Sequence, residues 1–437
     1  MATSAQAIRL SDDVWPPRGG LAGRGLIIAL MVLYPLHVTA PGNLNVSAGD
    51  AVAALLLALG AFRFLVGRVA LPRYVALVLL LVLVADASST ANALRGSAWY
   101  SIAAAQLEIL KLLSAAAWML AVFWLLLGDT PRRLLFLAGT SAVVAVPMAF
   151  WTVYLGLFGH VERPAGAFEN PNLYGNYLLL NMFLLLAAGS LLAEDRDGRM
   201  TGAPAALRRH AGLMVLGGLL AFVLGIFSTG SRGALVAMGA GLLVSVRWVP
   251  RRLRVKQLVA VPIALACVGA AIAWYFRHHP YLLVRLHRTG ATDHNVTERL
   301  TLWRAARDAF YAHPLLGIGY GQFQVLERAT HGAVAKVSHE TYLSYAAELG
   351  LPGLLAFLTL LVTVMRDAFV TRLAVGSRVA RYMFGFLVAS AVQALFNNVD
   401  QFRSLWIAFG VVAALVAYSA RGRGAASTPL ASGVLRR

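Results

Sequence analysis

The chain has 437 residues, of which 59% are hydrophobic and only 13% are charged. Soluble domains carry about 25% charged residues, so the chain lacks the polar surface that a water-soluble fold needs. The net charge of +19 would suggest nucleic acid in a soluble protein, but the sequence holds no basic–aromatic module for it. Cationic loops beside anionic lipid headgroups explain the charge better. The composition therefore predicts a membrane protein that does not bind nucleic acid.

Long apolar blocks rich in Leu, Ala and Val recur along the chain. Blocks of about 18 or more residues indicate transmembrane helices, whereas barrel strands would alternate over about ten residues. We predict an all-α polytopic protein with twelve spans, at 22–40, 48–66, 74–92, 103–127, 134–157, 173–193, 211–228, 233–248, 257–276, 340–365, 381–397 and 404–420. Residues 1–276 then hold nine spans, 277–338 an outer loop, 339–420 three more spans, and 421–437 a tail expected to be disordered.

The placement of Lys and Arg predicts the orientation. With a cytoplasmic N-terminus, most of the 38 basic residues fall on the inner side, and the short outer loops hold only Arg95, Arg163, Arg232 and Arg403. Basic loops stay in the cytoplasm, so both termini are expected there. The apolar stretch after Arg24 is too long for a signal peptide and should remain as the first span. The single cysteine, Cys267, should be a small buried hydrophobe.

The outer loop 277–338 predicts one amphipathic helix. Asn295 can cap it, with Glu298 three residues on as in a capping box. Pro314 and the glycines that follow should end it. Its apolar face is expected to hold Leu300, Trp303, Ala306 and Phe310.

Two short outer segments are polar where a membrane protein does not need to be. In residues 163–175, Asn170 and Asn172 flank Pro171, and Asn172 could cap the helix that follows. Arg163 is harder to explain as scaffold. In residues 228–233, Ser231 and Arg232 stand in a tight turn between two apolar helices. Such an arginine either reaches the interface or meets an anion in a wet cavity.

Two further residues belong to the same outer side. Arg299 lies in the first turn of the loop helix, where it either binds phosphate or pairs with an acid on another segment. His339 stands where the loop re-enters the membrane, and histidine is the usual general base near neutral pH. Its ordinary alternative is a hydrogen-bonded interfacial histidine.

Two polar groups carry weaker signals. Glu108 and Lys111 stand three residues apart in one span and should neutralise each other. In the outer loop 397–403, Asp400 could orient an arginine.

Several cations and one candidate base thus gather on one face, with no acidic cage for a metal. Arginines hold phosphate oxygens bidentately and stay charged. A diphosphate leaving group needs such fixed cations, and an attacking sugar hydroxyl needs a base. The pattern indicates metal-free, cofactor-free glycosyl transfer from a polyprenyl-diphosphate sugar.

The order of these motifs resembles the O-antigen ligase/O-antigen polymerase superfamily of membrane glycosyltransferases. The resemblance covers about residues 160–355, and in the first 150 residues it extends only to hydrophobic helices. The motifs that carry it are Arg163 with Asn170-Pro171-Asn172, Ser231-Arg232-Gly233, 299–303 with 314–321, and 339–343 with 348–353.

The resemblance implies a GT-C-like fold in the bacterial inner membrane with a periplasmic active site. Ligase members move O-antigen from undecaprenyl diphosphate to a sugar of lipid A–core in lipopolysaccharide biosynthesis. By position, Arg232 and Arg299 correspond to diphosphate-binding arginines, Arg163 to a further donor contact, and His339 to the essential histidine, acting as base or positioning the acceptor. Asn170, Asn172, Ser231, Tyr320, Glu340 and Asp400 are candidate supporting residues. Many members have Asn where this chain has Glu340, which could raise the pKa of His339.

Three other functions stay open. Within the superfamily, a polymerase joins two lipid-linked repeats, and a protein O-oligosaccharyltransferase uses a protein hydroxyl. The moderate length and compact outer loop favour the ligase. A transporter or flippase for lipid-linked glycans would also suit twelve spans, but it should show matching halves with broken helices at the membrane midplane, and the polar residues gather at one face instead.

Overall fold

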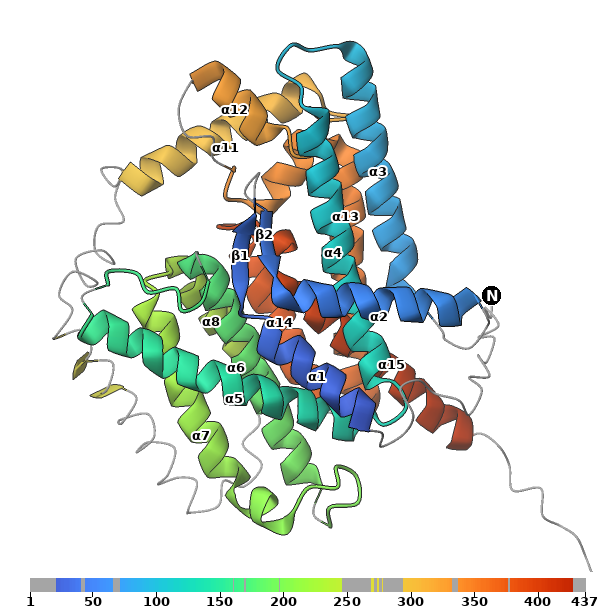
Figure 1. Cartoon of the computed structure of the whole chain (residues 1–437), viewed down its shortest axis with the longest axis vertical. Helices are drawn as coiled ribbons and strands as arrows, with labels where there is room; N and C mark the ends of the chain where they lie inside the picture. Colours follow the sequence, from blue (N-terminus) through green and yellow to red (C-terminus); the bar gives the residue numbers. More distant parts are fainter. Residues whose placement is uncertain are drawn as a thin grey trace, which may run out of the picture.

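The structure is a computed structural model of the whole chain (Figure 1). It describes residues 21–40, 44–65, 71–159, 161–168, 170–195, 197–245, 269–270, 273–274, 277, 294–331, 337–375 and 378–426. In chain order the elements are α1 (Leu21–Leu33), β1 (His37–Ala40), β2 (Leu44–Ser47), α2 (Ala48–Leu65), α3 (Tyr74–Arg95), α4 (Ile102–Leu126), α5 (Thr130–Leu157), α6 (Pro171–Glu194), α7 (Ala205–Ser228), α8 (Arg232–Ser245), α11 (His294–Ala312), α12 (Phe323–His331), α13 (Thr341–Val375), α14 (Arg378–Gln393), the 3₁₀ turn η1 (Val399–Gln401) and α15 (Arg403–Ala426).

The helices confirm a polytopic α-helical membrane protein. Within the described ranges, seven helices are long and apolar enough to cross a bilayer, and α1, α2 and α8 are shorter apolar helices. In lipid, backbone N–H and C=O groups must bond to each other, and either a helix or a closed β-barrel achieves this. The predicted span 257–276, with Cys267, lies mostly outside the described residues. The number of twelve spans and the GT-C likeness stay predictions.

The first predicted span, 22–40, is wrong in its second half. α1 ends at Leu33, and the chain forms the antiparallel hairpin β1–β2 with His37 opposite Ser47. Pro35 follows the last turn and cannot continue a helix. The Ser47 hydroxyl donates to the carbonyl oxygens of Leu33 (3.0 Å) and Tyr34 (2.8 Å), so the hairpin completes the open end of α1. It is the one sheet in the described part of the chain.

α4, α6 and α15 form the buried centre. α15 packs along α4, α14 packs against both α6 and α8, and α6 also contacts α5 and α7. Large aromatic side chains fill this centre and are almost fully buried: Trp118, Trp124, Trp406, Tyr174, Tyr177 and Phe183. α8 packs mainly against α14 and hardly touches α7, so the short turn between α7 and α8 does not make a closely packed hairpin.

Two of the sequence motifs are bound to each other as scaffold. α13 bends at Gly350, which has a positive φ of 66°. Residues 314–321 fill the bend: the Leu351 amide donates to the Pro314 carbonyl (2.8 Å), and the Gly319 amide donates to the Glu348 carbonyl (2.9 Å). A Cβ on Gly317 would lie 2.3 Å from the Glu348 backbone. The glycines of both motifs are therefore required for backbone contact, and they fix the outer loop to α13.

The amphipathic loop helix exists, but its details differ from the prediction. α11 runs from His294, one residue before Asn295, and the capping box stays a prediction. Its buried face holds Leu302, Ala306 and Ala309, whereas Leu300 is 39% exposed. The helix ends before Pro314 as predicted. At the other end of the chain, α15 continues past residue 420 to Ala426, and the rest of the predicted tail lies outside the described residues.

Candidate functional site

The start of α6 forms one side of the candidate site. Asn170 is the N-cap, with extended backbone (φ −116°, ψ 119°), and its side-chain oxygen accepts from the Asn172 amide. The prediction that Asn172 caps the helix is therefore wrong. Pro171 takes the first helical position, where a missing N–H has no cost, so the cap falls one residue before it. This leaves the Asn172 side chain available for a different contact.

The turn between α7 and α8 forms the second side of the site. The Ser231 hydroxyl donates to Asn172 Oδ1 (2.8 Å), and Arg163 Nε donates to the Thr229 carbonyl oxygen (3.4 Å). Arg232 is the first residue of α8 and is half-buried. Three segments that lie apart in the sequence thus meet, and they place Arg163, Asn172 and Arg232 together.

The third side of the site is the loop after α14, which contacts both α8 and α13. A Cβ on Gly233 would lie 3.1 Å from Asn397 Nδ2, so the loop after α14 lies directly on the start of α8. The Thr341 hydroxyl donates to the Asn397 carbonyl (2.7 Å), and the Thr341 amide donates to the Ala394 carbonyl (2.8 Å). The N-termini of α6, α8 and α13 therefore lie in one neighbourhood.

The electrostatics of these helix starts favour an anion. Helix N-termini carry partial positive charge. α6 and α8 have no acidic residue in the first turn, and both have neutral caps, Asn170 and Ser231. Arg163 and Arg232 add full positive charge at this point. In contrast, the Glu340 carboxylate caps α13 by accepting from the amides of Tyr342 and Leu343. The first turns of α6 and α8, unlike that of α13, therefore carry no capping carboxylate.

His339 lies just before α13 in an unusual backbone conformation. Its φ is +54°, the one positive φ of a non-glycine residue in the described part of the chain. Such a conformation costs about 1–2 kcal/mol for an L-residue, so the flanking contacts must hold it. Ser338 is buried and its hydroxyl contacts the Ser344 hydroxyl (2.5 Å), while the Glu340 cap holds the other side. The imidazole is half-buried.

α11 brings Arg299 to the same region. The Trp303 indole donates to the Ser338 carbonyl (3.1 Å), which ties α11 to the residue before His339. Arg299 is half-buried and precedes Trp303 by four residues, so both side chains leave the helix on the same face. Sequence spacing alone could not show that this face turns toward His339.

The sequence suggested that Glu340 acts on the pKa of His339, but the structure gives its carboxylate another role. Its carboxylate is buried and faces the first amides of α13. Burial raises the pKa of Glu340 above its ordinary value, against the lowering effect of these amides. The structure therefore gives Glu340 a capping role that orients the His339 backbone.

Tyr320 and Asp400 lie in a separate small pocket beside His339. Glu108, Tyr345, Glu348 and Ser338 also line it. Burial, and secondly the Glu108 carboxylate, raises the pKa of Asp400 to about 7. Burial raises the pKa of the Tyr320 phenol well above its ordinary value. The predicted pair of Glu108 and Lys111 is confirmed, with 2.5 Å between Glu108 Oε1 and Lys111 Nζ.

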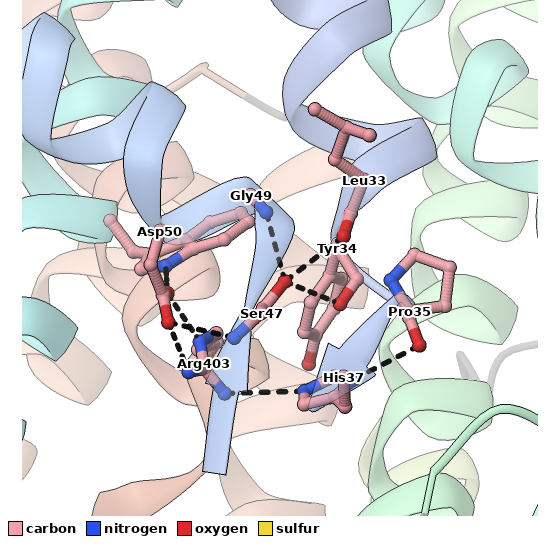
Figure 2. A network of polar contacts seen from close by, with 9 residues as sticks. Leu33, Tyr34, Pro35, His37, Ser47, Gly49, Asp50 and Arg403 are labelled. Carbon is pink, nitrogen blue, oxygen red and sulfur yellow. Dashed lines mark hydrogen bonds and ion pairs between the residues drawn. The ribbon is translucent and has the colours of Figure 1, made fainter. Parts of the chain in front are cut away.

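The arginine expected near Asp400 has a different partner. Arg403 Nε donates to Asp50 Oδ1 (2.6 Å), and Arg403 Nη2 forms an ion pair with Asp50 Oδ2 (Figure 2). Asp50 Oδ1 also accepts from the Trp118 indole (2.6 Å), and Asp50 Oδ2 accepts from the Ser47 amide (2.9 Å). The sequence reasoning missed this network, although a lone acid at the start of α2 was a visible signal.

His37 extends this network toward the candidate site. Its Nδ1 lies 3.0 Å from the Pro35 carbonyl oxygen, and its Nε2 lies 3.2 Å from Arg403 Nη1 (Figure 2). A carbonyl and a guanidinium as neighbours require Nδ1 to carry the proton and Nε2 to accept. The imidazole packs against Phe168, with 4.5 Å between ring centroids. Phe168 belongs to the loop that carries Arg163, so the ion pair supports that loop through His37.

Comparison with known proteins gives one family match. Residues 217–358 match the O-antigen ligase family. The match covers about a third of the chain and confirms the resemblance to the O-antigen ligase/polymerase superfamily over this segment. The matched segment contains Arg232, Arg299 and His339, whereas Arg163 and the start of α6 precede it. No curated protein matches the chain. Within the described residues, no group of three His, Cys, Asp or Glu side chains is placed to hold a metal ion.

Proposed function

We propose that the chain is an O-antigen ligase that transfers a glycan from undecaprenyl diphosphate to a sugar hydroxyl of lipid A–core. One observation carries the proposal. Arg232 stands at the start of α8, beside the neutral-capped start of α6, and Arg163 donates to the Thr229 carbonyl in the adjoining turn, next to the segment that holds His339 in a left-handed conformation. Fixed positive charge beside a candidate base is what diphosphate departure and hydroxyl attack require.

The proposed reaction is a direct displacement. The His339 imidazole takes the proton of the acceptor hydroxyl as the hydroxyl oxygen attacks the anomeric carbon. The bond from that carbon to the diphosphate oxygen breaks, and the electron pair leaves with the diphosphate. Arg232, Arg299 and Arg163 stabilise this charge together with the starts of α6 and α8, and with no metal or nucleotide. One displacement inverts the anomeric centre.

The proposed setting is the bacterial inner membrane, with both termini in the cytoplasm and the site in the periplasm. Its support is the charge placement in the sequence and the hydrogen bond from Trp303 to Ser338, which ties the outer-loop helix α11 to the segment of His339.

The test gives the purified full chain undecaprenyl-diphosphate O-antigen and lipid A–core, and measures the size of the lipid A–core product by gel. The expected result is a shift that persists with a metal chelator. A product formed without lipid A–core would favour polymerase, and glycan attached to an added protein would favour the protein transferase. Movement of the donor across a vesicle with no new glycosidic bond would favour a transporter. A strict need for Mg²⁺ would overturn the mechanism.

A further inference from the structure

A second cavity lies in the membrane-spanning part, away from the candidate site. It has a volume of about 1330 Å³ and lies between α1, α5, α6 and α7. Its walls are mostly apolar. On its open side, Val143 is 75% exposed, Met214 56% and Ile28 45%, so in a bilayer this side meets lipid. Apolar side chains that line a cavity open to the bilayer favour hydrocarbon as the occupant.

One end of the cavity is cationic. Arg24, Arg132 and Arg133 line it there, with Asp129 as the one acid among the lining residues. Arg132 is 52% exposed and lies 3.6 Å from Asp129 through its Nε, and the Arg24 guanidinium lies 5.9 Å from the centre of the Phe136 ring. Positive charge therefore remains in excess at the mouth, where an anionic headgroup would sit.

The dimensions of the cavity fit one leaflet of a bilayer. Along α5 the lining runs from Arg132 to Pro147, which corresponds to about 22 Å of helix. Half of a hydrocarbon core is about 15 Å thick, so an acyl chain and its headgroup region together span this length. The lipid of this cavity is not the proposed glycan donor, whose diphosphate binds at Arg232. α7 lines the cavity only up to Gly218, and its remaining turns, up to Ser228, separate the cavity from the turn that leads to Arg232.

We propose that this cavity binds an anionic glycerophospholipid, with its acyl chains between α1, α5 and α7 and its headgroup at Arg24 and Arg132. The bound lipid closes the open side of the bundle between α1 and α7, so it stabilises the folded chain in proportion to its occupancy. This inference does not depend on the proposed transfer reaction.

Gly139 offers a way to block the cavity. It lines the cavity on α5, and a Cβ at this position would meet no atom within 4 Å. Gly139→Leu therefore adds a side chain to empty space. Gly217, on α7, is the matched control, because its Cβ would also meet nothing and it does not line the cavity. Both variants replace a helical glycine with the same apolar residue, so a general effect of leucine appears in both.

The experiment measures lipid binding to the purified full chain in neutral detergent. Phosphatidylglycerol and phosphatidylcholine with identical acyl chains are compared by native mass spectrometry, and the thermal midpoint is recorded with each. We expect phosphatidylglycerol to bind more tightly and to raise the midpoint more. Gly139→Leu should weaken its binding by about tenfold or more, whereas Gly217→Leu should not.

The charge is tested separately. Arg24→Gln with Arg132→Gln should lower the preference for phosphatidylglycerol by about fivefold per arginine. Arg209→Gln, an exposed residue of α7 outside the lining, is the control. Equal binding of the two lipids by the wild type, or no loss in Gly139→Leu, would overturn the proposal. So would a polyprenyl monophosphate that displaces phosphatidylglycerol at equal concentration.

Discussion

Arg403 and Arg232 are both the first residue of a helix, α15 and α8, yet their surroundings differ. Arg403 is only 8% exposed and meets the Asp50 carboxylate, which Trp118 and Ser47 hold in place. Arg232 stands beside a second helix start with a neutral cap, and no acid occurs in the first turn of either helix. A helix N-terminus already disfavours a cation. The comparison teaches that the fold pairs the first arginine with a buried carboxylate, whereas it places the second beside two helix starts that have no acid in their first turns.

This contrast separates a structural cation from a candidate ligand-binding cation. Loss of the first should change stability, because it leaves a buried charge without its partner. Loss of the second should change activity and leave stability nearly unaltered. The following expectations test that separation, from the largest effect to the smallest.

The largest effect is expected at His339. His339→Ala should lower the rate of glycan transfer by about 10²–10⁴-fold, the usual contribution of a general base. Purified enzyme, donor and lipid A–core are assayed for initial rate, and thermal midpoints are compared. His210→Ala, an exposed histidine on α7, is the control. If His339→Ala keeps most of its transfer activity, His339 is not the base.

Arg232→Ala comes next, with an expected loss of about 10²–10³-fold in kcat, the size seen when one charge-stabilising donor is removed. Arg232→Lys should recover only part of this, because an ammonium cannot bind a diphosphate bidentately. The thermal midpoint should change little. A large fall in the thermal midpoint with unchanged kcat would show that Arg232 is a structural residue like Arg403, and would contradict the proposed difference between the two arginines.

Asp50→Ala should act in the opposite way. Removal of the carboxylate leaves Arg403 buried without its main partner, which costs about 3 kcal/mol or more in the free energy of unfolding. Thermal midpoints of Asp50→Ala, Arg403→Met and the double variant, measured in one detergent, form a cycle. We expect the double variant to be more stable than Asp50→Ala. Additive losses would show that the two side chains do not interact.

A smaller and pH-dependent effect is expected from Asp400. Burial raises its pKa in the folded chain from 3.8 to about 7, so the folded state holds a proton that the unfolded state has already lost. Stability therefore falls as the pH rises from about 4 to about 7. The thermal midpoint of the wild type should fall across this window more than that of Asp400→Asn. Parallel curves would contradict the raised pKa.

The smallest effect is expected at the cap of α6. Asn170→Ala removes the acceptor for the Asn172 amide and should cost about 1 kcal/mol. Asn170→Ser restores a cap and should return the thermal midpoint to near that of the wild type. Equal midpoints for the Ala and Ser variants would show that the cap contributes nothing.

The sequence located most helices because their cause is local. A backbone in lipid must bond to itself, and long apolar blocks leave a helix as the one local solution. The failures are equally physical. Pro35 ended α1 within an apolar block, and Pro171 moved the cap of α6 from Asn172 to Asn170. Hydropathy measures how apolar a side chain is, so it does not predict the effect of the backbone N–H that a proline lacks.

For the candidate site, the sequence by itself determined the residue types, namely arginines and a histidine placed in short polar turns between apolar helices. Tertiary structure decided which of them meet. The Ser231–Asn172 bond joins residues 59 positions apart, and the Asp50–Arg403 pair spans 353 positions. Such pairings depend on how helices pack, since an arginine is compatible with either a carboxylate or a phosphate until its neighbours are fixed. Local pattern therefore predicts a cation at Arg232 and Arg403 alike, and only packing assigns one to the scaffold and the other to the candidate site.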